Sequence, residues 1–210
     1  IRNFLKNKKD GDMDSRDILT IKGLIRRGEA RTASSYNNIP LDRVHFLDLP
    51  FYETGKIQKN PISEADVEIV RNLLREVKPH QIFVAGDLAD PHGTHRVCTD
   101  AVFAAIDLEK EEGAKWLKDC RIWMYRGAWA EWEIENIEMA VPISPEELRA
   151  KRNSILKHQS QMESAPFLGN DERLFWQRSE DRNHATAVLY DQLGLASYEA
   201  MEAFVEYIPL

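Results

Sequence analysis

The chain has 210 residues, with 28 basic and 35 acidic side chains and a formal net charge of −7. This length fits a single domain, which we expect to span residues 1–210 and to bury a substantial core. The negative balance creates no general attraction for a polyanion, so we expect no nucleic-acid partner. No apolar run approaches the ~20 residues that a membrane helix needs, so we expect no membrane partner.

The first half of the chain alternates between helical and extended patterns. Residues 14–36 carry apolar side chains at helical spacing, and residues 44–49 form a short apolar run that predicts a buried strand ending at Pro50. Ser63 and Asp66 form a capping-box pattern that predicts the start of a helix, and Lys78 with the proline after it predicts its end.

The second half continues the alternation. Strands are predicted at residues 82–85, 121–125 and 138–141, and helices at about 94–112, 144–161 and 183–193, with Gly113 closing the first of these helices. Such alternation predicts an α/β fold, a Rossmann-like three-layer parallel sheet. We expect the strands that end at Leu49, Gly86 and Tyr125 to be parallel. The chain starts at Ile1 in what reads as the middle of a helix, so we expect the N-terminal strands of the sheet to be missing.

The most informative segment is the loop that follows the strand at residues 82–85. It carries His92 and His95, three residues apart, just before a helix. Ligands gather at the carboxyl ends of parallel strands, and imidazole serves both as a metal ligand and as an acid or base near neutral pH. The alternative is that both histidines are hydrogen-bonded surface residues.

The run His92-Gly93-Thr94-His95-Arg96 resembles the His-Pro-Asp-His-Arg signature of the PIG-L/LmbE family, zinc-dependent deacetylases of N-acetylglucosamine-containing compounds. Further stretches resemble the family in the same order, over most of residues 20–165: 26–29, 46–49, 52–55, 151–154 and 158–161. The tail, with Trp176 and residues 183–195, looks more like the branch that is fused behind a glucosamine-6-phosphate deaminase (isomerase) domain.

The resemblance implies a role for four residues. His95 would be a zinc ligand, and His92 would stabilise the oxyanion or protonate the leaving amine during amide hydrolysis. Arg26 and Glu53 would bind the amino-sugar substrate, the first through its rigid fork of donors. Arg26 could equally be a solvated charge on its helix, and Glu53 an ordinary surface acid.

Two departures from the family pattern bear on zinc. Thr94 stands where the family signature has an acid, and the family's His-Pro-Asp-Asp segment, which supplies two zinc ligands and the general base, is absent. His95 alone falls short of the three protein ligands of a catalytic zinc site, and Asp87 and Asp90 are the only local substitutes. We therefore expect zinc in the complete domain but weak or absent zinc binding by this chain.

Several other residues have a structural interpretation. His45 lies in the apolar run and is expected to be a buried, hydrogen-bonded histidine. Trp123, Trp129 and Trp132 could stack on a sugar ring, but buried packing is the better explanation. Cys98 is expected to pack as a small hydrophobic side chain. With Cys120 it forms no CxxC pair, which favours a reducing compartment, the cytoplasm.

Two functions follow, from different classes. The first is zinc-dependent N-deacetylation of an N-acetylglucosamine-type compound in amino-sugar metabolism. The alternative is a non-catalytic binding or regulatory domain of a glucosamine-6-phosphate deaminase. Dinucleotide binding is a third, weak hypothesis, because no G-x-G-x-x-G follows a strand. Without its first strands the sheet would expose unpaired backbone, so we expect a homo-oligomer or association with the missing N-terminal part.

Overall fold

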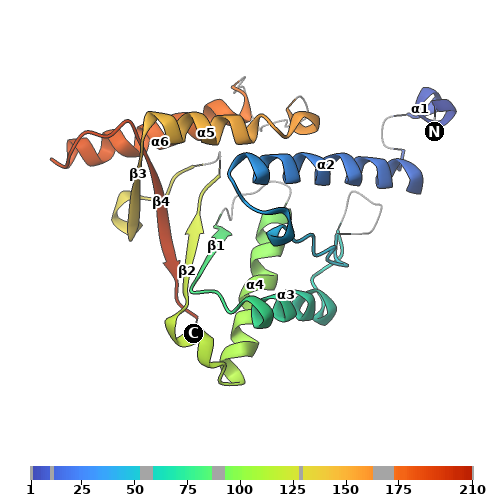
Figure 1. Ribbon diagram of the computed structural model, residues 1–210, viewed down its shortest axis with the longest axis horizontal. Helices are drawn as coiled ribbons and strands as arrows, with labels where there is room; N and C mark the ends of the chain where they lie inside the picture. Colours follow the sequence, from blue (N-terminus) through green and yellow to red (C-terminus); the bar gives the residue numbers. More distant parts are fainter. Residues whose placement is uncertain are drawn as a thin grey trace.

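The computed structural model describes residues 2–9, 12–52, 59–86, 93–127, 130–162 and 173–209. Its elements form an α/β fold in which helices flank a four-stranded sheet (Figure 1). The helices are α1 (Arg2–Asn7), α2 (Arg16–Tyr36), α3 (Glu64–Val77), α4 (Thr94–Glu111), α5 (Pro145–Ile155) and α6 (Phe175–Gln192). The strands are β1 (Gln81–Ala85), β2 (Arg121–Tyr125), β3 (Met139–Ile143) and β4 (Ala200–Tyr207). Short 3-10 turns lie at Leu41–Arg43, Lys115–Asp119, Ile134–Asn136 and Gln159–Gln161.

The sheet is mixed, with the strand order β1-β2-β4-β3. β1 and β2 are parallel, as predicted, with Phe83 opposite Trp123. β4 runs antiparallel to both β2 and β3, with Phe204 opposite Tyr125 on one side and Met139 on the other. The expectation of a wholly parallel sheet is therefore wrong, because β4 comes from the end of the chain and enters from the opposite direction.

Residues 44–49 do not form a strand, which corrects the prediction for this segment. The segment is irregular, and Leu47 and Leu49 pack against the core while His45 is exposed. An apolar run becomes a strand only when a neighbour takes up its backbone hydrogen bonds, and none of the strands in the described part of the chain pairs with it. The expectation that His45 is buried is therefore also wrong.

The helix starts follow local sequence rules. Ser63 caps α3 through a capping box with Asp66, and Asp66 also accepts a hydrogen bond of 2.8 Å from the backbone N–H of Phe51. Ser144 caps α5 in the same way, with Pro145 as the first helical residue. α5 ends at Ile155, earlier than the predicted residue 161, and a separate 3-10 turn follows.

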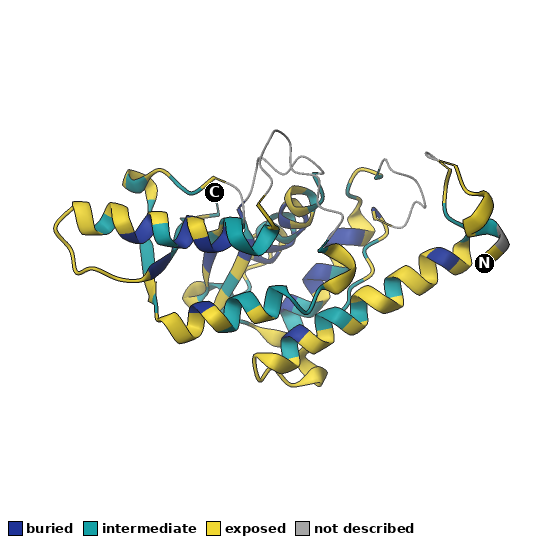
Figure 2. Cartoon of the chain, turned by 90° about the horizontal axis from the view of Figure 1, so that it is seen from above, coloured by how far each residue is buried: buried dark blue, intermediate teal, exposed yellow. Residues whose placement is uncertain are grey.

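The main core lies between the sheet and the pair α3 and α4. It joins Val70 of α3, Ala105 and Ile106 of α4, Val84 of β1 and Ile122 of β2. On the opposite face of β1, Phe83 is 48% exposed and meets Phe204 edge to face, with 5.4 Å between the ring centroids. Burial is therefore concentrated in the middle of the molecule, while much of α2 is exposed (Figure 2).

Candidate functional site

The carboxyl ends of β1 and β2 point toward α2, α5 and α6 (Figure 1). Gly93 precedes α4 with φ +66°, and the Thr99 hydroxyl donates a 2.7 Å hydrogen bond to the carbonyl of Ala85. This bond holds the first turns of α4 against the end of β1. His95 is the second residue of α4, so the fold places it at the carboxyl edge of the parallel strands, with an exposed side chain.

The four predicted site residues have different outcomes. His92 and Glu53 lie outside the described residues, as do Asp87 and Asp90. Arg26 is described and lies exposed on α2. His95 and Arg26 therefore keep accessible positions that suit ligand contact, whereas the roles of all four remain predictions.

α2 brings together three of the stretches that resemble the family. Arg27 forms an ion pair with Asp48 and stacks over the Phe46 ring, 5.4 Å from its centroid. Glu29 accepts hydrogen bonds from the backbone N–H and the hydroxyl of Ser160, at 2.6 and 2.7 Å. Residues 26–29, 46–49 and 158–161 are thus neighbours in space although 131 positions separate Glu29 from Ser160.

We call the two hydrogen bonds between Glu29 and Ser160 the Glu29–Ser160 clasp. The Glu29 carboxylate remains charged in it. Burial raises its pKa, but the two Ser160 hydrogen bonds and the charges of His158 and Arg26 outweigh burial, so the pKa is lowered overall. Arg26 thus contributes positive charge beside Glu29. The arrangement gives residues 26–29 a structural purpose in addition to any contact with substrate.

A buried polar cluster, which sequence reasoning missed, lies next to this edge. Lys151 of α5 donates to Glu202 at 2.6 Å and to Asn183 of α6 at 2.7 Å, and Arg182 of α6 contacts both Glu202 and Glu131. Phe204 of β4 is opposite Tyr125, the last residue of β2, and β4 runs antiparallel to β2. Glu202 of β4 therefore lies past the carboxyl end of β2. We call these five residues the Lys151–Glu202 cluster.

The charges in the Lys151–Glu202 cluster balance. Burial lowers the pKa of Lys151, and the charge of Glu202 opposes that shift only in part. Burial raises the pKa of Glu202, but the charges of Arg182 and Lys151 outweigh it and the net shift is downward. No local pattern signals this cluster, because its members come from three elements and a loop that are far apart in the sequence.

The tryptophans pack, as expected, where they are described. Trp123 is 5% exposed, and the Trp132 ring lies against Gly86, where an added Cβ would meet it at 2.7 Å. Arg126 stacks over Trp132 at 3.9 Å from the ring centroid. Trp129 lies outside the described residues. Cys98 is exposed, so the expectation that it packs inside its helix is wrong.

The described residues do not fit a zinc centre. Within the ranges that the structure covers, no three His, Cys, Asp or Glu side chains come together in a way that could hold a metal ion. A catalytic zinc site needs three protein ligands, and His95 is the predicted ligand that these ranges contain. Within the same ranges, no helix is both long enough and apolar enough to cross a membrane.

Comparison with known proteins shows which family part of the chain resembles. The model of the PIG-L family, described as GlcNAc-PI de-N-acetylase, matches residues 6–106. A Bacteroides thetaiotaomicron protein, named "Putative glucosamine-6-phosphate deaminase-like protein", is 97% identical over all 210 residues, and the chain spans 32% of its length. The chain therefore carries a PIG-L/LmbE-like domain.

Solved structures support the same fold. The 4-carboxy-2-hydroxymuconate hydratase GalB of Pseudomonas putida matches with a TM-score of 0.62 and 14% identity, over 89% of this chain and 72% of that one. The N,N'-diacetylchitobiose deacetylase of Pyrococcus horikoshii matches with a TM-score of 0.53 and 16% identity, over 89% and 64%. A hydratase and a deacetylase share this fold, so the fold alone does not select a reaction.

Proposed function

We propose that the chain belongs to a hydrolase that removes the acetyl group from an N-acetylglucosamine-type compound. The observation that carries the proposal is His95 in the first turn of α4, at the carboxyl end of β1, inside a segment that the PIG-L family model matches. In this reaction water adds to the acetyl carbon and the amide C–N bond breaks. Acetate leaves, and the amine takes up a proton.

Each proposed residue has a stated role. His95 contributes an imidazole ligand to the metal, and His92 supplies the proton to the leaving amine or steadies the oxyanion. Arg26 and Glu53 bind the sugar. Exposure of Arg26 and His95 supports their roles, and the family resemblance supports those of His92 and Glu53.

Zinc is proposed for the complete domain only. Because the described residues supply no three-ligand set, we derive no catalytic step through a metal from them. The substrate is a small amino-sugar compound, and the 210 residues form one domain in this proposal. Cys98 and Cys120 form no disulfide with each other, which suits a reducing compartment such as the cytoplasm.

The second candidate is a non-catalytic binding or regulatory domain of a glucosamine-6-phosphate deaminase. Two observations favour it: Thr94 in place of the family's acid, and the name of the Bacteroides relative. Such a domain would bind an amino sugar or a neighbouring domain without cleaving an amide.

Metal content separates the two candidates. We would measure zinc per polypeptide and acetate release from N-acetylglucosamine compounds in the full-length protein, in His95→Gln and in His80→Gln. His80 is exposed and directly precedes β1, so it lies at the opposite edge of the sheet and serves as the matched control. Stoichiometric zinc that is lost only in His95→Gln supports the deacetylase. Equal and negligible zinc in all three, without acetate release, supports the regulatory domain.

A further inference from the structure

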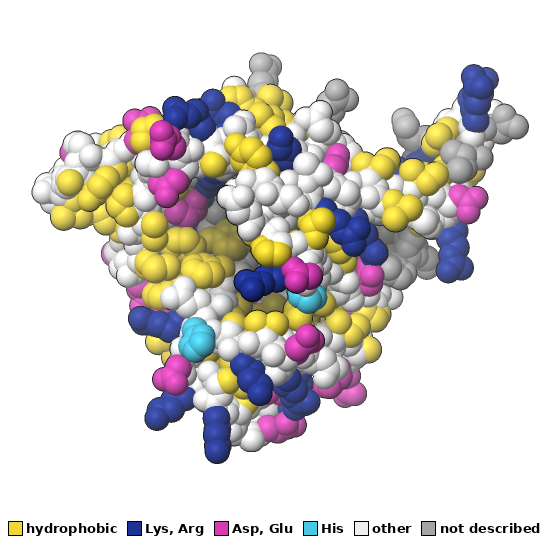
Figure 3. All heavy atoms as spheres, viewed as in Figure 1, with side chains coloured by type: hydrophobic (Ala, Val, Ile, Leu, Met, Phe, Trp, Pro, Cys, Tyr) yellow, Lys and Arg dark blue, Asp and Glu magenta, His cyan; other side chains and the backbone are white. Residues whose placement is uncertain are grey.

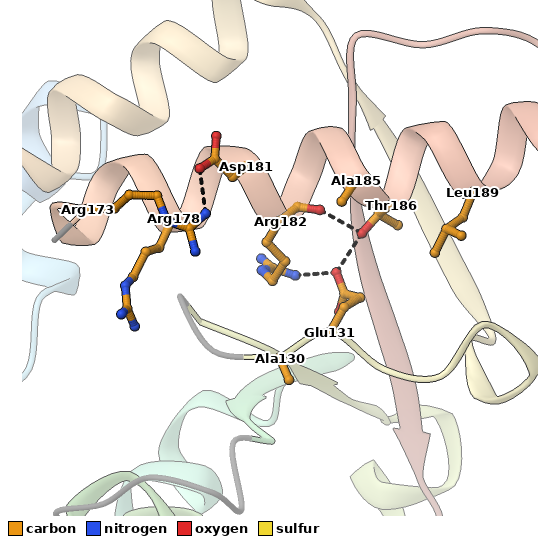
Figure 4. Close-up of a pocket in the computed structure, with 9 residues that line it drawn as sticks. All are labelled: Ala130, Glu131, Arg173, Arg178, Asp181, Arg182, Ala185, Thr186 and Leu189. Atoms are coloured by element: carbon orange, nitrogen blue, oxygen red, sulfur yellow. Dashed lines mark hydrogen bonds and ion pairs between the residues drawn. The ribbon is translucent and has the colours of Figure 1, made fainter. Parts of the chain in front are cut away.

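A pocket of about 570 Å³ lies between α6 and the segment at residues 130–131 (Figure 4). Three arginines, Arg173, Arg178 and Arg182, line it together with two carboxylates and four uncharged residues: Glu131, Asp181, Ala130, Ala185, Thr186 and Leu189. A volume of this order fits a small molecule. Asp181 pairs with Arg173, and Glu131 pairs with Arg182.

The pocket adjoins the proposed catalytic edge. Its Glu131 precedes Trp132, whose ring packs against Gly86 at the end of β1. Its Arg182 belongs to the Lys151–Glu202 cluster, which lies beyond the end of β2. A ligand in this pocket would therefore lie on the side of the sheet where His95 begins α4.

The arrangement of the charges favours an anion. Arg178 and Arg182 are one helical turn apart and extend to the same side of α6, whereas Asp181 extends to the other side and binds Arg173 at 2.7 Å (Figure 4). Glu131 meets Arg182 at 2.5 Å, and it also accepts from Thr186 at 2.9 Å.

Arg182 retains a donor for a ligand. Its side chain lines the pocket, the residue is 7% exposed, and its Nε has no hydrogen-bond partner among the described residues. A buried guanidinium N–H without an acceptor is costly, and an oxyanion that reached it would remove that cost. Guanidinium groups offer planar forks of donors that match phosphate and carboxylate oxygens.

We propose that this pocket binds the oxyanion group, phosphate or carboxylate, of a small-molecule ligand, with Arg178 and Arg182 as the binding residues. The inference deepens the proposed function, on which it rests, because it makes the amino-sugar substrate a negatively charged one. Ala130, Ala185 and Leu189 form the apolar part of the wall and would pack against the uncharged part of the ligand.

The test is hydrogen–deuterium exchange of the full-length protein, because peptides from residues 173–192 cover the helix that lines this pocket. The probes are inorganic phosphate, glucuronate, N-acetylglucosamine 6-phosphate and N-acetylglucosamine, without added zinc. We expect protection of these peptides by the sugar phosphate and not by the uncharged sugar. Protection by phosphate assigns the pocket to phosphate groups, and protection by glucuronate alone assigns it to carboxylates.

Variants make the result specific. Arg178→Gln should lower the affinity for the protecting ligand about tenfold or more, which is the loss expected for a charge-assisted contact. Arg178→Lys keeps the positive charge but loses the planar fork of donors. Its affinity for the ligand should lie between those of Arg178→Gln and the wild type. Arg149→Gln, on the exposed face of α5, should leave the binding unchanged. Thermal melting establishes that each variant is folded.

Two outcomes would overturn the inference: no anion protects residues 173–192, or Arg178→Gln binds the anion as well as the wild type does. Neither readout depends on zinc or turnover. A protein that binds the anion but releases no acetate would therefore refute the deacetylase and retain the pocket.

Discussion

Gly86 shows how a single residue sets the geometry of the edge. It has no side chain at a point where a Cβ would lie 2.7 Å from the Cβ of Met124 and 2.7 Å from the Trp132 ring. Contacts that short force neighbouring groups to move. The absence of a side chain therefore lets Trp132 rest on the end of β1, directly before the loop that leads to His95.

Gly86→Ala should destabilise the protein by about 1–3 kcal/mol, the usual cost of overpacking. Gly23→Ala is the control, because Gly23 lies inside α2 with nothing within 4 Å of an added Cβ. That change should be neutral or should stabilise by up to about 1 kcal/mol, since alanine favours the helix. Urea denaturation followed by tryptophan fluorescence measures both. Equal effects of the two substitutions would refute the packing argument.

The clasp between Glu29 and Ser160 gives a second prediction at the residue scale. A double-mutant cycle with Glu29→Gln and Ser160→Ala should show a coupling free energy of about 1 kcal/mol, because Ser160→Ala removes the hydroxyl hydrogen bond and leaves the backbone one. Asn153 and Tyr36, joined by one hydrogen bond of 2.9 Å at the exposed surface, provide a comparison pair through Asn153→Ala and Tyr36→Phe. Additive effects of the Glu29 and Ser160 substitutions would mean that the Ser160 hydroxyl does not contribute to holding α2.

At the scale of elements, an ion cluster joins α3 to α4. The Glu109 carboxylate is 3% exposed in total and accepts hydrogen bonds of 2.6 Å from both Arg71 and Arg75. Burial raises the pKa of Glu109, but the hydrogen bonds from the two arginines outweigh burial and the pKa is lowered overall. Arg71 is itself buried and also pairs with Glu112 at 2.5 Å, so removal of the Glu109 carboxylate would leave its positive charge only partly compensated.

Glu109→Gln should therefore cost about 1.5–3 kcal/mol at neutral pH, the range for lost hydrogen bonds to a charged group, because Glu112 still pairs with both arginines. Because the folded pKa is lowered, this contribution is present above the ordinary value of 4.5 and is lost as the pH falls through the folded pKa. The stability difference between wild type and variant should shrink below about pH 4.5. Urea midpoints over a pH series measure it.

Glu111→Gln is the matched control for this prediction. Glu111 lies in the same turn of α4 but is exposed, so the substitution should change stability by less than about 0.5 kcal/mol. A Glu109→Gln variant that is as stable as the control at neutral pH would show that the cluster contributes little.

At the scale of the whole molecule, the chain exposes much surface. Its accessible area is 13965 Å², whereas a compact monomer of 24.3 kDa exposes about 10,000 Å². β1 lies at the edge of the sheet, and within the described part of the chain no strand covers its outer side. Ile21, Leu24 and Ile25 are 42%, 63% and 48% exposed on the projecting α2, and apolar side chains gather around a hollow on one face (Figure 3).

We therefore expect residues 1–210, expressed alone, to associate or to melt without a cooperative transition. Size exclusion with light scattering and thermal melting measure both properties. Leu24→Lys with Ile25→Lys should shift the chain toward the monomer. Val188→Lys on α6, at a side chain that is 54% exposed, should not. A monodisperse monomer with a cooperative transition would contradict this prediction.

Local sequence determined much of the fold and the position of one candidate ligand. Ser63, Ser144 and Gly113 marked helix ends correctly because capping depends on residues within one turn. The parallel pair β1 and β2 and the place of His95 followed from the order of strand, loop and helix. The resemblance to the PIG-L/LmbE family rested on short motifs, and the family comparison confirmed it.

Tertiary structure alone decided the rest. Residues 44–49 have a strand's composition but no partner strand among the described residues, and β4 entered the sheet antiparallel from the end of the chain. Lys151, Arg182 and Glu202 meet only because α5, α6 and β4 pack together. Strand pairing and buried charge depend on neighbours distant in sequence, and no local pattern carries that information.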